Sequence, residues 1–293
     1  MNNVHGILLV VGAMAAFALE DMFIKHLSVT VPTGQIMVVL GVICSLAFVV
    51  MSLATRKRIL DPVAWQPLPL MRAGTEAVGA LSFVTALSLV DLSTVAAVFQ
   101  AMPLAVTMGA ALFLGEHVGW RRWSAIGIGF IGVLMIIRPG LAGFQPESLF
   151  VVASVLAIAA RDLITRKLDV RVASSVVALQ AYVAVAFAGV ALMVFSAQPV
   201  VPLHTWQIGP YLGAVGFGFL GYYGIVIAMR IGEASALTPF RYTRLIFSIA
   251  AGMLMFGERP DLMTLAGATL IMGSGMYTFI RERRLARELA VAA

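Results

Sequence analysis

The sequence is dominated by long apolar runs, and their length restricts what the chain can fold into. Ten runs are bounded by charged residues, proline or glycine, and they fall at 6–27, 34–54, 72–90, 94–114, 120–138, 148–168, 174–196, 208–230, 235–256 and 262–280. A helix that crosses the roughly 30 Å hydrocarbon core of a bilayer needs about 20 apolar residues. The runs do not alternate with period two, which excludes a transmembrane β-barrel. The sequence therefore predicts an all-α integral membrane protein with ten transmembrane helices.

Composition leaves little room for anything else. The chain has 293 residues, of which 61% are hydrophobic and 12% charged, so ten spans leave only short connections. The net charge of +6 is scattered through those connections without interleaved aromatic residues, which argues against nucleic acid as a partner. Cys44 is alone, and the four histidines (His5, His26, His117 and His204) lack the spacing of metal ligands. We expect no metal and no cofactor.

The positive charges also predict an orientation. If successive helices alternate in direction, fourteen Lys and Arg residues fall on one side of the membrane, against Lys25, Arg138 and Arg259 on the other. Positively charged loops are retained in the cytoplasm. Both termini are therefore expected to be cytoplasmic.

The chain contains an internal repeat. Phe113-Leu114-Gly115-Glu116 returns as Met255-Phe256-Gly257-Glu258, an offset of 142 residues, and Glu20-Asp21 aligns with Arg161-Asp162 at an offset of 141. These anchors divide the chain into halves, 1–141 and 142–293, with five predicted helices each. Because five is odd, the second half must insert upside down relative to the first. Inverted repeats of this kind build secondary transporters, whose substrate site lies near the midplane between the repeats. We therefore expect two inverted five-helix repeats around a central cavity.

Each Gly-Glu pair has a predicted local role. Gly115 and Gly257 end apolar runs, where a left-handed glycine caps a helix, and the following Glu lies near the start of the next helix.

Together with the ten-helix arrangement, the repeated pattern resembles a known family. A small or polar segment (Ser93–Ala97 in the first half, Ala234–Pro239 in the second) precedes an apolar run, Gly-Glu and another glycine-rich run. In this the chain resembles the EamA-type transporters of the drug/metabolite transporter superfamily, in particular bacterial exporters of amino acids and metabolites. The second half departs from the first, because Arg241 and Arg244 replace Phe99 and Met102.

The resemblance implies a secondary transporter rather than an enzyme. It implies export of small metabolites, above all amino acids including aromatic ones, across the bacterial inner membrane by alternating access. The expected partners are the substrate and the lipid bilayer, and the chain is expected to be a monomer. The alternatives are a multidrug or other small-metabolite transporter, a proton-coupled exchanger, and a channel. No G-x-x-x-x-G-K-[ST] motif supports ATP hydrolysis, and no cluster of acids, histidines and a nucleophile supports a membrane enzyme.

Charged residues inside the apolar runs are the candidate functional residues, because a charge that faces lipid costs several kcal/mol. They are Glu20, Asp21, Glu76, Arg161, Asp162, Arg241 and Arg244. We expect Gln100, Tyr242 and Arg244 to line the cavity, with Arg244 attracting a substrate carboxylate. The alternative is that Arg244 is locked to Glu20 or Asp21 as a gating or structural pair.

The other charged residues and several aromatic residues complete the candidate site. Phe17, Phe83, Tyr223 and Glu76 are expected to contribute to substrate binding, and aromatic side chains suit an amphipathic substrate. Ordinary helix or lipid packing is the alternative for each aromatic residue. Glu20, Asp21, Arg161, Asp162 and Arg241 are candidates for gating or coupling.

Overall fold

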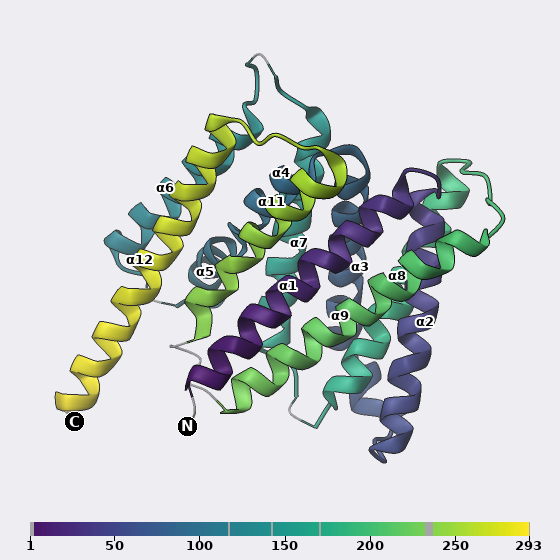
Figure 1. Cartoon of the computed structure of the whole chain (residues 1–293). Coiled ribbons are helices and arrows are strands. Elements are labelled where there is room, and N and C mark those ends of the chain that lie inside the picture. Colours follow the sequence, from purple (N-terminus) through teal and green to yellow (C-terminus); the bar gives the residue numbers. More distant parts are fainter. Residues whose placement is uncertain (1–2, 117, 142, 170, 232–236, 293) are drawn as a thin grey trace. The chain divides into compact units, whose positions relative to one another are not determined.

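The computed structural model describes residues 3–116, 118–141, 143–169, 171–231 and 237–292, and these residues form helices and connecting loops without strands (Figure 1). The α-helices are α1 (Asn3–Ser28), α2 (Thr33–Ala54), α3 (Pro67–Leu89), α4 (Leu92–Phe99), α5 (Met102–Phe113), α6 (Trp120–Ile137), α7 (Leu149–Thr165), α8 (Ser174–Phe195), α9 (Thr205–Ile231), α11 (Thr243–Phe256) and α12 (Leu262–Ala292). Three 3₁₀-helices accompany them: η1 (Pro62–Trp65), η2 (Pro146–Ser148) and η3 (Thr238–Tyr242). His117 and the Ala234–Ala236 part of the repeated pattern lie outside the described residues.

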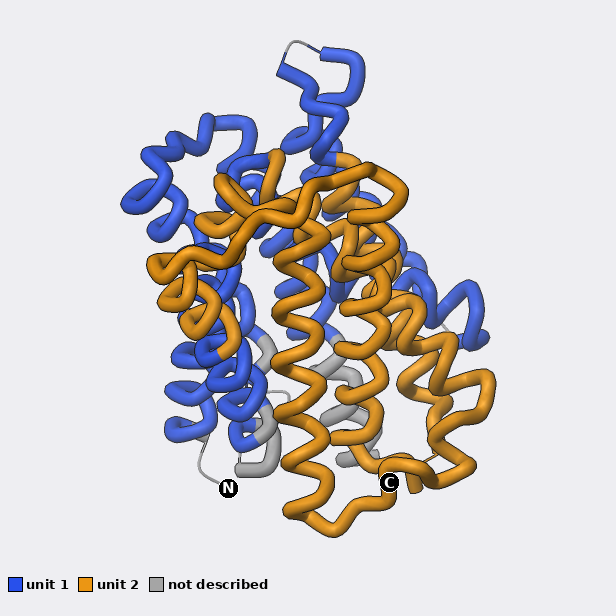
Figure 2. The backbone as a smooth tube through the Cα atoms, turned by 90° about the vertical axis from the view of Figure 1, so that its right-hand side faces the viewer, with its two compact units in different colours: residues 1–22, 90–148, 216–293 blue, residues 23–89, 149–215 orange. Residues whose placement is uncertain are grey.

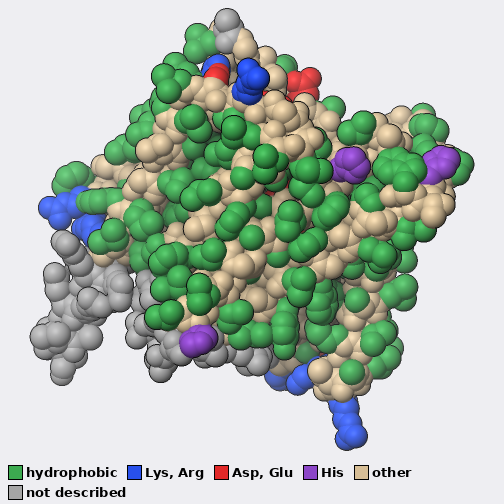
Figure 3. All heavy atoms as spheres, viewed as in Figure 1, with side chains coloured by type: hydrophobic (Ala, Val, Ile, Leu, Met, Phe, Trp, Pro, Cys, Tyr) green, Lys and Arg blue, Asp and Glu red, His purple; other side chains and the backbone are tan. Residues whose placement is uncertain are grey.

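Several helices are suited to a bilayer. Seven of the described helical segments are long and apolar enough to cross a membrane: Val4–Ser28, Thr33–Ala54, Leu92–Phe113, Trp120–Ile137, Pro146–Thr165, Ser174–Phe195 and Leu262–Arg281. Three other runs were predicted. The run 72–90 overlaps α3, the run 208–230 overlaps α9, and the run 235–256 overlaps η3 together with α11. Hydrophobic side chains cover most of the face shown in Figure 3, and the charged side chains visible there lie near its edges. The all-helical, multi-pass membrane class is confirmed, and the total of ten spans stays a prediction.

The helices form two compact units (Figure 2). Unit 1 comprises residues 1–22, 90–148 and 216–293, and unit 2 comprises residues 23–89 and 149–215. Within unit 1, α6 packs against α12 and α4 against α11; within unit 2, α2 packs against α8 and α3 against α7. Each unit therefore combines helices from both halves of the sequence.

Glycines allow two of these pairs to approach closely. A Cβ atom on Gly132 of α6 would lie 2.6 Å from the carbonyl oxygen of Gly267 in α12, and one on Gly267 would lie 2.5 Å from the Gly132 oxygen. In unit 2, Gly34 of α2 and Gly189 of α8 stand in the same reciprocal relation, at 2.7 Å. Small residues promote packing in membranes in this way, because they let backbones touch where lipid supplies no hydrophobic driving force.

Two predicted spans are interrupted. The run 94–114 divides into α4 and α5 at Gln100 and Ala101, with Pro103 in the first turn of α5. The run 235–256 contains η3, which begins with Thr238-Pro239, and continues as α11. Proline lacks an N–H and its ring clashes with the preceding turn, so each interruption lies close to a proline. Gln100 and Tyr242 therefore lie at interruptions rather than inside regular helix.

The predicted glycine caps are confirmed. Gly115 and Gly257 have φ values of +69° and +64°, in the left-handed region. The N–H of Glu116 donates to the Ala110 carbonyl at 3.2 Å, and the N–H of Glu258 donates to the Gly252 carbonyl at 3.1 Å. Each bond runs from the residue after the glycine back to a carbonyl six residues earlier, so the left-handed glycine lets the chain turn back onto the helix end, which explains why glycine precedes each Glu.

The Glu258 side chain does not cap the helix that follows it. In unit 1 its carboxylate accepts hydrogen bonds from the backbone N–H groups of Leu92 at 2.6 Å and Ser93 at 2.9 Å, and from the Ser93 hydroxyl at 2.8 Å. Those N–H groups begin α4, where the helix has no internal acceptors for them. The following helix, α12, is capped by Asp261, which accepts from Thr264 N–H at 2.8 Å and pairs with Arg138. Hydrogen bonds from Arg138 and Thr264 lower the pKa of Asp261 to about 2.

Removing the Glu258 carboxylate should destabilise the protein. We expect Glu258→Ala to lower the free energy of unfolding by about 1–3 kcal/mol, because two N–H groups and a hydroxyl lose their acceptor in a buried place. Thermal unfolding of the detergent-purified protein, followed by circular dichroism, measures this. Arg259→Gln, at the exposed neighbour, is the control. Equal transition temperatures for Glu258→Ala and the control would contradict the assigned role.

Candidate functional site

A buried ion pair in unit 1 links the first helix to the last part of the chain. Nη2 of Arg244, in α11, donates to Oδ2 of Asp21, in α1, at 2.7 Å. Asp21 is only 3% exposed. A carboxylate this deeply buried needs a charged partner, and Arg244 supplies it.

Two aromatic rings flank the same guanidinium. The Arg244 guanidinium carbon lies 5.3 Å from the centre of the Phe17 ring and 5.4 Å from the centre of the Phe99 ring. Both distances are typical of cation–π contacts. Phe17 is one turn before Asp21 and so shares its face of α1. Phe99 was not predicted from the sequence, although it lies directly before the interruption at Gln100.

Gln100 and Tyr242, which align in the repeat, are in contact. The Gln100 side-chain amide donates to the backbone carbonyl of Tyr242 at 3.2 Å. Both residues are buried, and the Tyr242 hydroxyl occupies the space that a side chain on Gly275 would need. Backbone groups at helix interruptions are available to ligands in many transporters. Gln100, Tyr242, Arg244 and Phe17, four of the predicted binding residues, thus belong to unit 1 and gather around α4, α11 and α1.

A second set of charges lies in unit 2 between α3 and α7. Nη1 of Arg161 lies 2.8 and 3.1 Å from the two carboxylate oxygens of Glu76. Arg161 also binds Asp162, at 2.8 Å, and Arg72 binds Glu76 at 3.2 Å. Two bases and two acids balance one another in this cluster.

The remaining predicted residues are more dispersed. Phe83 is half-buried in α3, Tyr223 is 58% exposed on α9, and Arg241 is exposed in η3. Glu20 is half-buried in α1, with its carboxylate against Gly218 of α9; a Cβ atom there would lie 2.6 Å from Glu20 Oε1. Among the described residues, Tyr223 makes no hydrogen bond with the Asp21–Arg244 pair.

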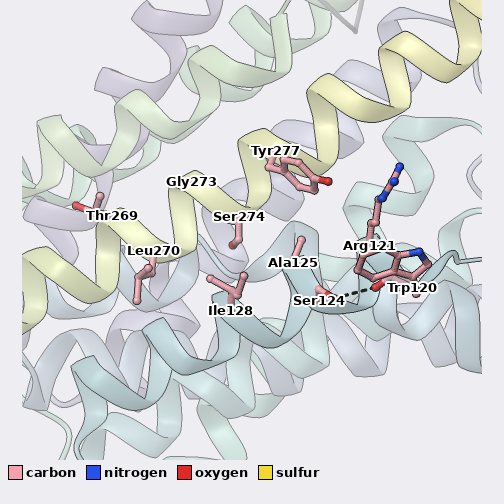
Figure 4. A pocket seen from close by; sticks show the side chains of 10 residues that line it. All are labelled: Trp120, Arg121, Ser124, Ala125, Ile128, Thr269, Leu270, Gly273, Ser274 and Tyr277. Atoms are coloured by element: carbon pink, nitrogen blue, oxygen red, sulfur yellow. Dashed lines mark hydrogen bonds between the residues drawn. The ribbon is translucent and has the colours of Figure 1, made fainter.

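Unit 1 also carries a groove between α6 and α12 (Figure 4). Its volume is about 420 Å³. The lining residues are Trp120, Arg121, Ser124, Ala125, Ile128, Thr269, Leu270, Gly273, Ser274 and Tyr277. None of them was predicted as a site residue. The groove therefore involves a different part of unit 1 from the Asp21–Arg244 pair. The described residues contain no group of three or more His, Cys, Asp or Glu side chains that could hold a metal ion.

The sequence of this chain is similar to those of transporters that are named for different substrates. The chain is 28% identical to an S-adenosylmethionine uptake transporter of Rickettsia conorii over 206 residues, which cover 70% of this chain and 69% of that protein. It is 31% identical to a riboflavin transporter of Rhizobium johnstonii over 224 residues, 75% of this chain and 72% of that protein. It is 25% identical to a pseudopaline exporter of Pseudomonas aeruginosa over 272 residues, 91% of this chain and 93% of that protein.

A comparison with solved structures and a match to a protein family agree with these similarities to transporters. A protein of known crystal structure, 20% identical, superposes with a TM-score of 0.61 over 96% of this chain and 98% of its own, which establishes a shared fold. Residues 4–138 and 145–280 each match the EamA-like transporter family. The resemblance inferred from the repeated pattern is therefore confirmed. The chain belongs to the EamA-like transporter family and is a multi-pass membrane transporter with bacterial relatives.

Proposed function

We propose that this protein is a secondary transporter of small zwitterionic metabolites, with amino acids as the main class. The observation that carries the proposal is the Asp21–Arg244 pair, 2.7 Å apart, with Arg244 flanked by Phe17 and Phe99. In the proposed complex the carboxylate of the solute binds Arg244 and its ammonium group binds Asp21.

The electrostatics of a buried pair favour a solute of this kind. Separating Asp21 from Arg244 leaves two buried charges without partners, which is strongly unfavourable. A zwitterion supplies one charge of each sign, so it replaces both partners at once and keeps the region neutral. The rings of Phe17 and Phe99 offer apolar surface to the body of an aromatic or hydrophobic amino acid. A solute with one charge, or none, leaves a charge of the protein unpaired.

The relatives support the same chemistry in part. S-adenosylmethionine carries an amino group and a carboxylate on one carbon, as amino acids do, and one relative is named for its uptake. Riboflavin lacks this group, and another relative is named for its transport. The two compounds therefore make a suitable contrast for a transport assay.

The rest of the proposal concerns topology and direction. Ten helices form two inverted repeats, 1–141 and 142–293, around a central cavity that opens alternately to each side. Both termini are cytoplasmic, as the loop charges indicate, and the monomer exports its substrate across the bacterial inner membrane. The internal offset of 141–142 residues and the family match over 4–138 and 145–280 support the two-repeat arrangement.

Solute counterflow in proteoliposomes tests the proposed substrate class. The purified protein is reconstituted, and exchange is measured for phenylalanine, leucine, S-adenosylmethionine, riboflavin and ethidium, with and without a pH gradient. We expect saturable counterflow of the compounds that carry an amino acid group and no measurable counterflow of riboflavin or ethidium. Exchange of ethidium alone would make this a multidrug transporter, and exchange of riboflavin alone would also overturn the proposal. Flux that rises linearly with concentration would instead indicate a channel.

A further inference from the structure

Two helix pairs, one in each unit, make equivalent contacts. In unit 2, a Cβ atom on Gly79 of α3 would lie 2.6 Å from the Ile158 side chain of α7. In unit 1, a Cβ atom on Gly221 of α9 would lie 2.9 Å from the Phe17 ring of α1. Gly221 follows Gly79 by 142 residues and Ile158 follows Phe17 by 141, the same offsets that define the repeat. One pair can therefore serve as an internal reference for the other.

The charges at the neighbouring positions of these pairs differ. In unit 2, Arg161 of α7 faces Glu76 of α3, with an ion pair of 2.8 Å. The equivalent residues in unit 1 are Glu20 at the Arg161 position and Gly218 at the Glu76 position. Glu20 does lie against Gly218. In unit 1, therefore, the acid Glu20 stands where unit 2 has the base Arg161. The glycine Gly218 stands where unit 2 has the acid Glu76.

This exchange changes the balance of charges around the equivalent helix pair of unit 1. Arg72 and Arg161 balance Glu76 and Asp162 in unit 2. In unit 1 the carboxylates of Glu20 and Asp21 both interact with Arg244, which forms an ion pair with Asp21. Glu20 makes no hydrogen bond and no ion pair among the described residues. Asp21 and Arg244 are the charged groups that act on it, and Gly218 of α9 lies against its carboxylate.

We propose that Glu20 is the binding site for one additional positive charge that moves with the solute. This inference rests on the proposed function and extends it: the Asp21–Arg244 pair receives the zwitterionic group, and Glu20 receives a further cation. That cation is a second positive group of the solute, such as a sulfonium or amine, or a proton carried with a neutral zwitterion. An unpaired carboxylate inside a membrane protein costs several kcal/mol, and a bound positive charge removes that cost. Glu20 is half-buried, and Gly218 is the position where a side chain would clash with its carboxylate, so the glycine keeps that carboxylate free of a neighbouring side chain there.

Transport of two related probes by Glu20→Gln tests the proposal and separates the two sources of charge. S-adenosylmethionine carries one net positive charge and methionine carries none. If the solute supplies the charge, Glu20→Gln raises the KM for S-adenosylmethionine about tenfold and leaves methionine unchanged. If a proton supplies it, Glu20→Gln abolishes the response of methionine transport to a pH gradient. Unchanged behaviour in both assays overturns the proposal.

Matched variants guard against an effect on folding. Glu20→Asp retains the charge and should keep both properties within about twofold of the wild type. Glu147→Gln removes an acid from the short 3₁₀-helix η2 of unit 1 and should change neither property. Loss of transport in Glu20→Asp and in Glu20→Gln alike, with normal thermal unfolding, would point to side-chain size rather than charge and would overturn the proposal.

A measurement that does not depend on transport distinguishes failure of this inference from failure of the proposed function. If Glu20 binds a positive charge, we expect a proton to occupy it and neutralise its carboxylate in solute-free protein at mildly acidic pH. The infrared absorption of a protonated carboxylic acid should therefore be present in the wild type and weaker in Glu20→Gln. Equal spectra would overturn the role of Glu20 even if methionine is transported. A difference between the spectra would support that role even if neither probe is transported.

Discussion

Arg244→Gln should reduce amino acid counterflow at least about 100-fold, while Arg58→Gln, at an exposed loop position, leaves it unchanged. In the wild type, Arg244 is the partner of a carboxylate that is only 3% exposed, and it lies between two aromatic rings. The variant removes the proposed ligand of the substrate carboxylate and leaves Asp21 buried without a base. Breaking a buried pair from one side costs about 3–5 kcal/mol. Counterflow is measured at matched amounts of reconstituted protein.

Loss of transport alone would not separate binding from folding, so a double variant is needed. Asp21→Asn combined with Arg244→Gln removes both charges, and replacing both partners of a buried pair is far less destabilising than removing one. We expect the double variant to recover most of the thermal stability that Arg244→Gln loses, but not its transport. Recovery of both would assign the pair a structural role only, and wild-type counterflow in Arg244→Gln would remove it from the site altogether.

Much of the fold could be predicted because its signals are local. A run of apolar residues, a bounding proline and a glycine before Glu each act within one or two turns, and the helices lie close to the predicted runs. The two left-handed glycines were found for the same reason. The interruption between α4 and α5 was missed although Pro103 was visible, because proline is tolerated in the first turn of a helix and also near the end of a broken span.

The site was less accessible to sequence reasoning because its contacts are distant along the chain. The sequence left two partners open for Arg244, a substrate carboxylate or an acid of the first helix, and the structure places it on Asp21, 223 residues away. Glu258 caps α4 from 166 residues away, although its place in the sequence suggested the following helix. No local pattern encodes either contact. The roles of Tyr242, Phe83 and Tyr223 in substrate binding stay predictions.

Gly132→Leu should prevent stable folding or lower the free energy of unfolding by more than about 3 kcal/mol, the second large effect that we expect. Its Cβ atom would meet the carbonyl oxygen of Gly267 at 2.6 Å and the Ile271 side chain at 2.9 Å. A backbone oxygen cannot move aside by changing a rotamer, so α6 and α12 must separate along their whole contact. Thermal unfolding and the elution profile of the detergent-solubilised protein measure the effect.

Gly127→Leu, five residues earlier on the same helix, separates this steric effect from the loss of glycine itself. No atom would lie within 4 Å of a Cβ atom at Gly127, and the residue is exposed. Leucine forms helix better than glycine by up to about 1 kcal/mol, so this variant should be as stable as the wild type or slightly more stable. If both leucine variants unfold at the wild-type temperature, α6 and α12 do not pack through these glycines. If Gly127→Leu is as damaged as Gly132→Leu, the outer face of α6 is covered in the membrane, and the close approach at Gly267 is not the cause.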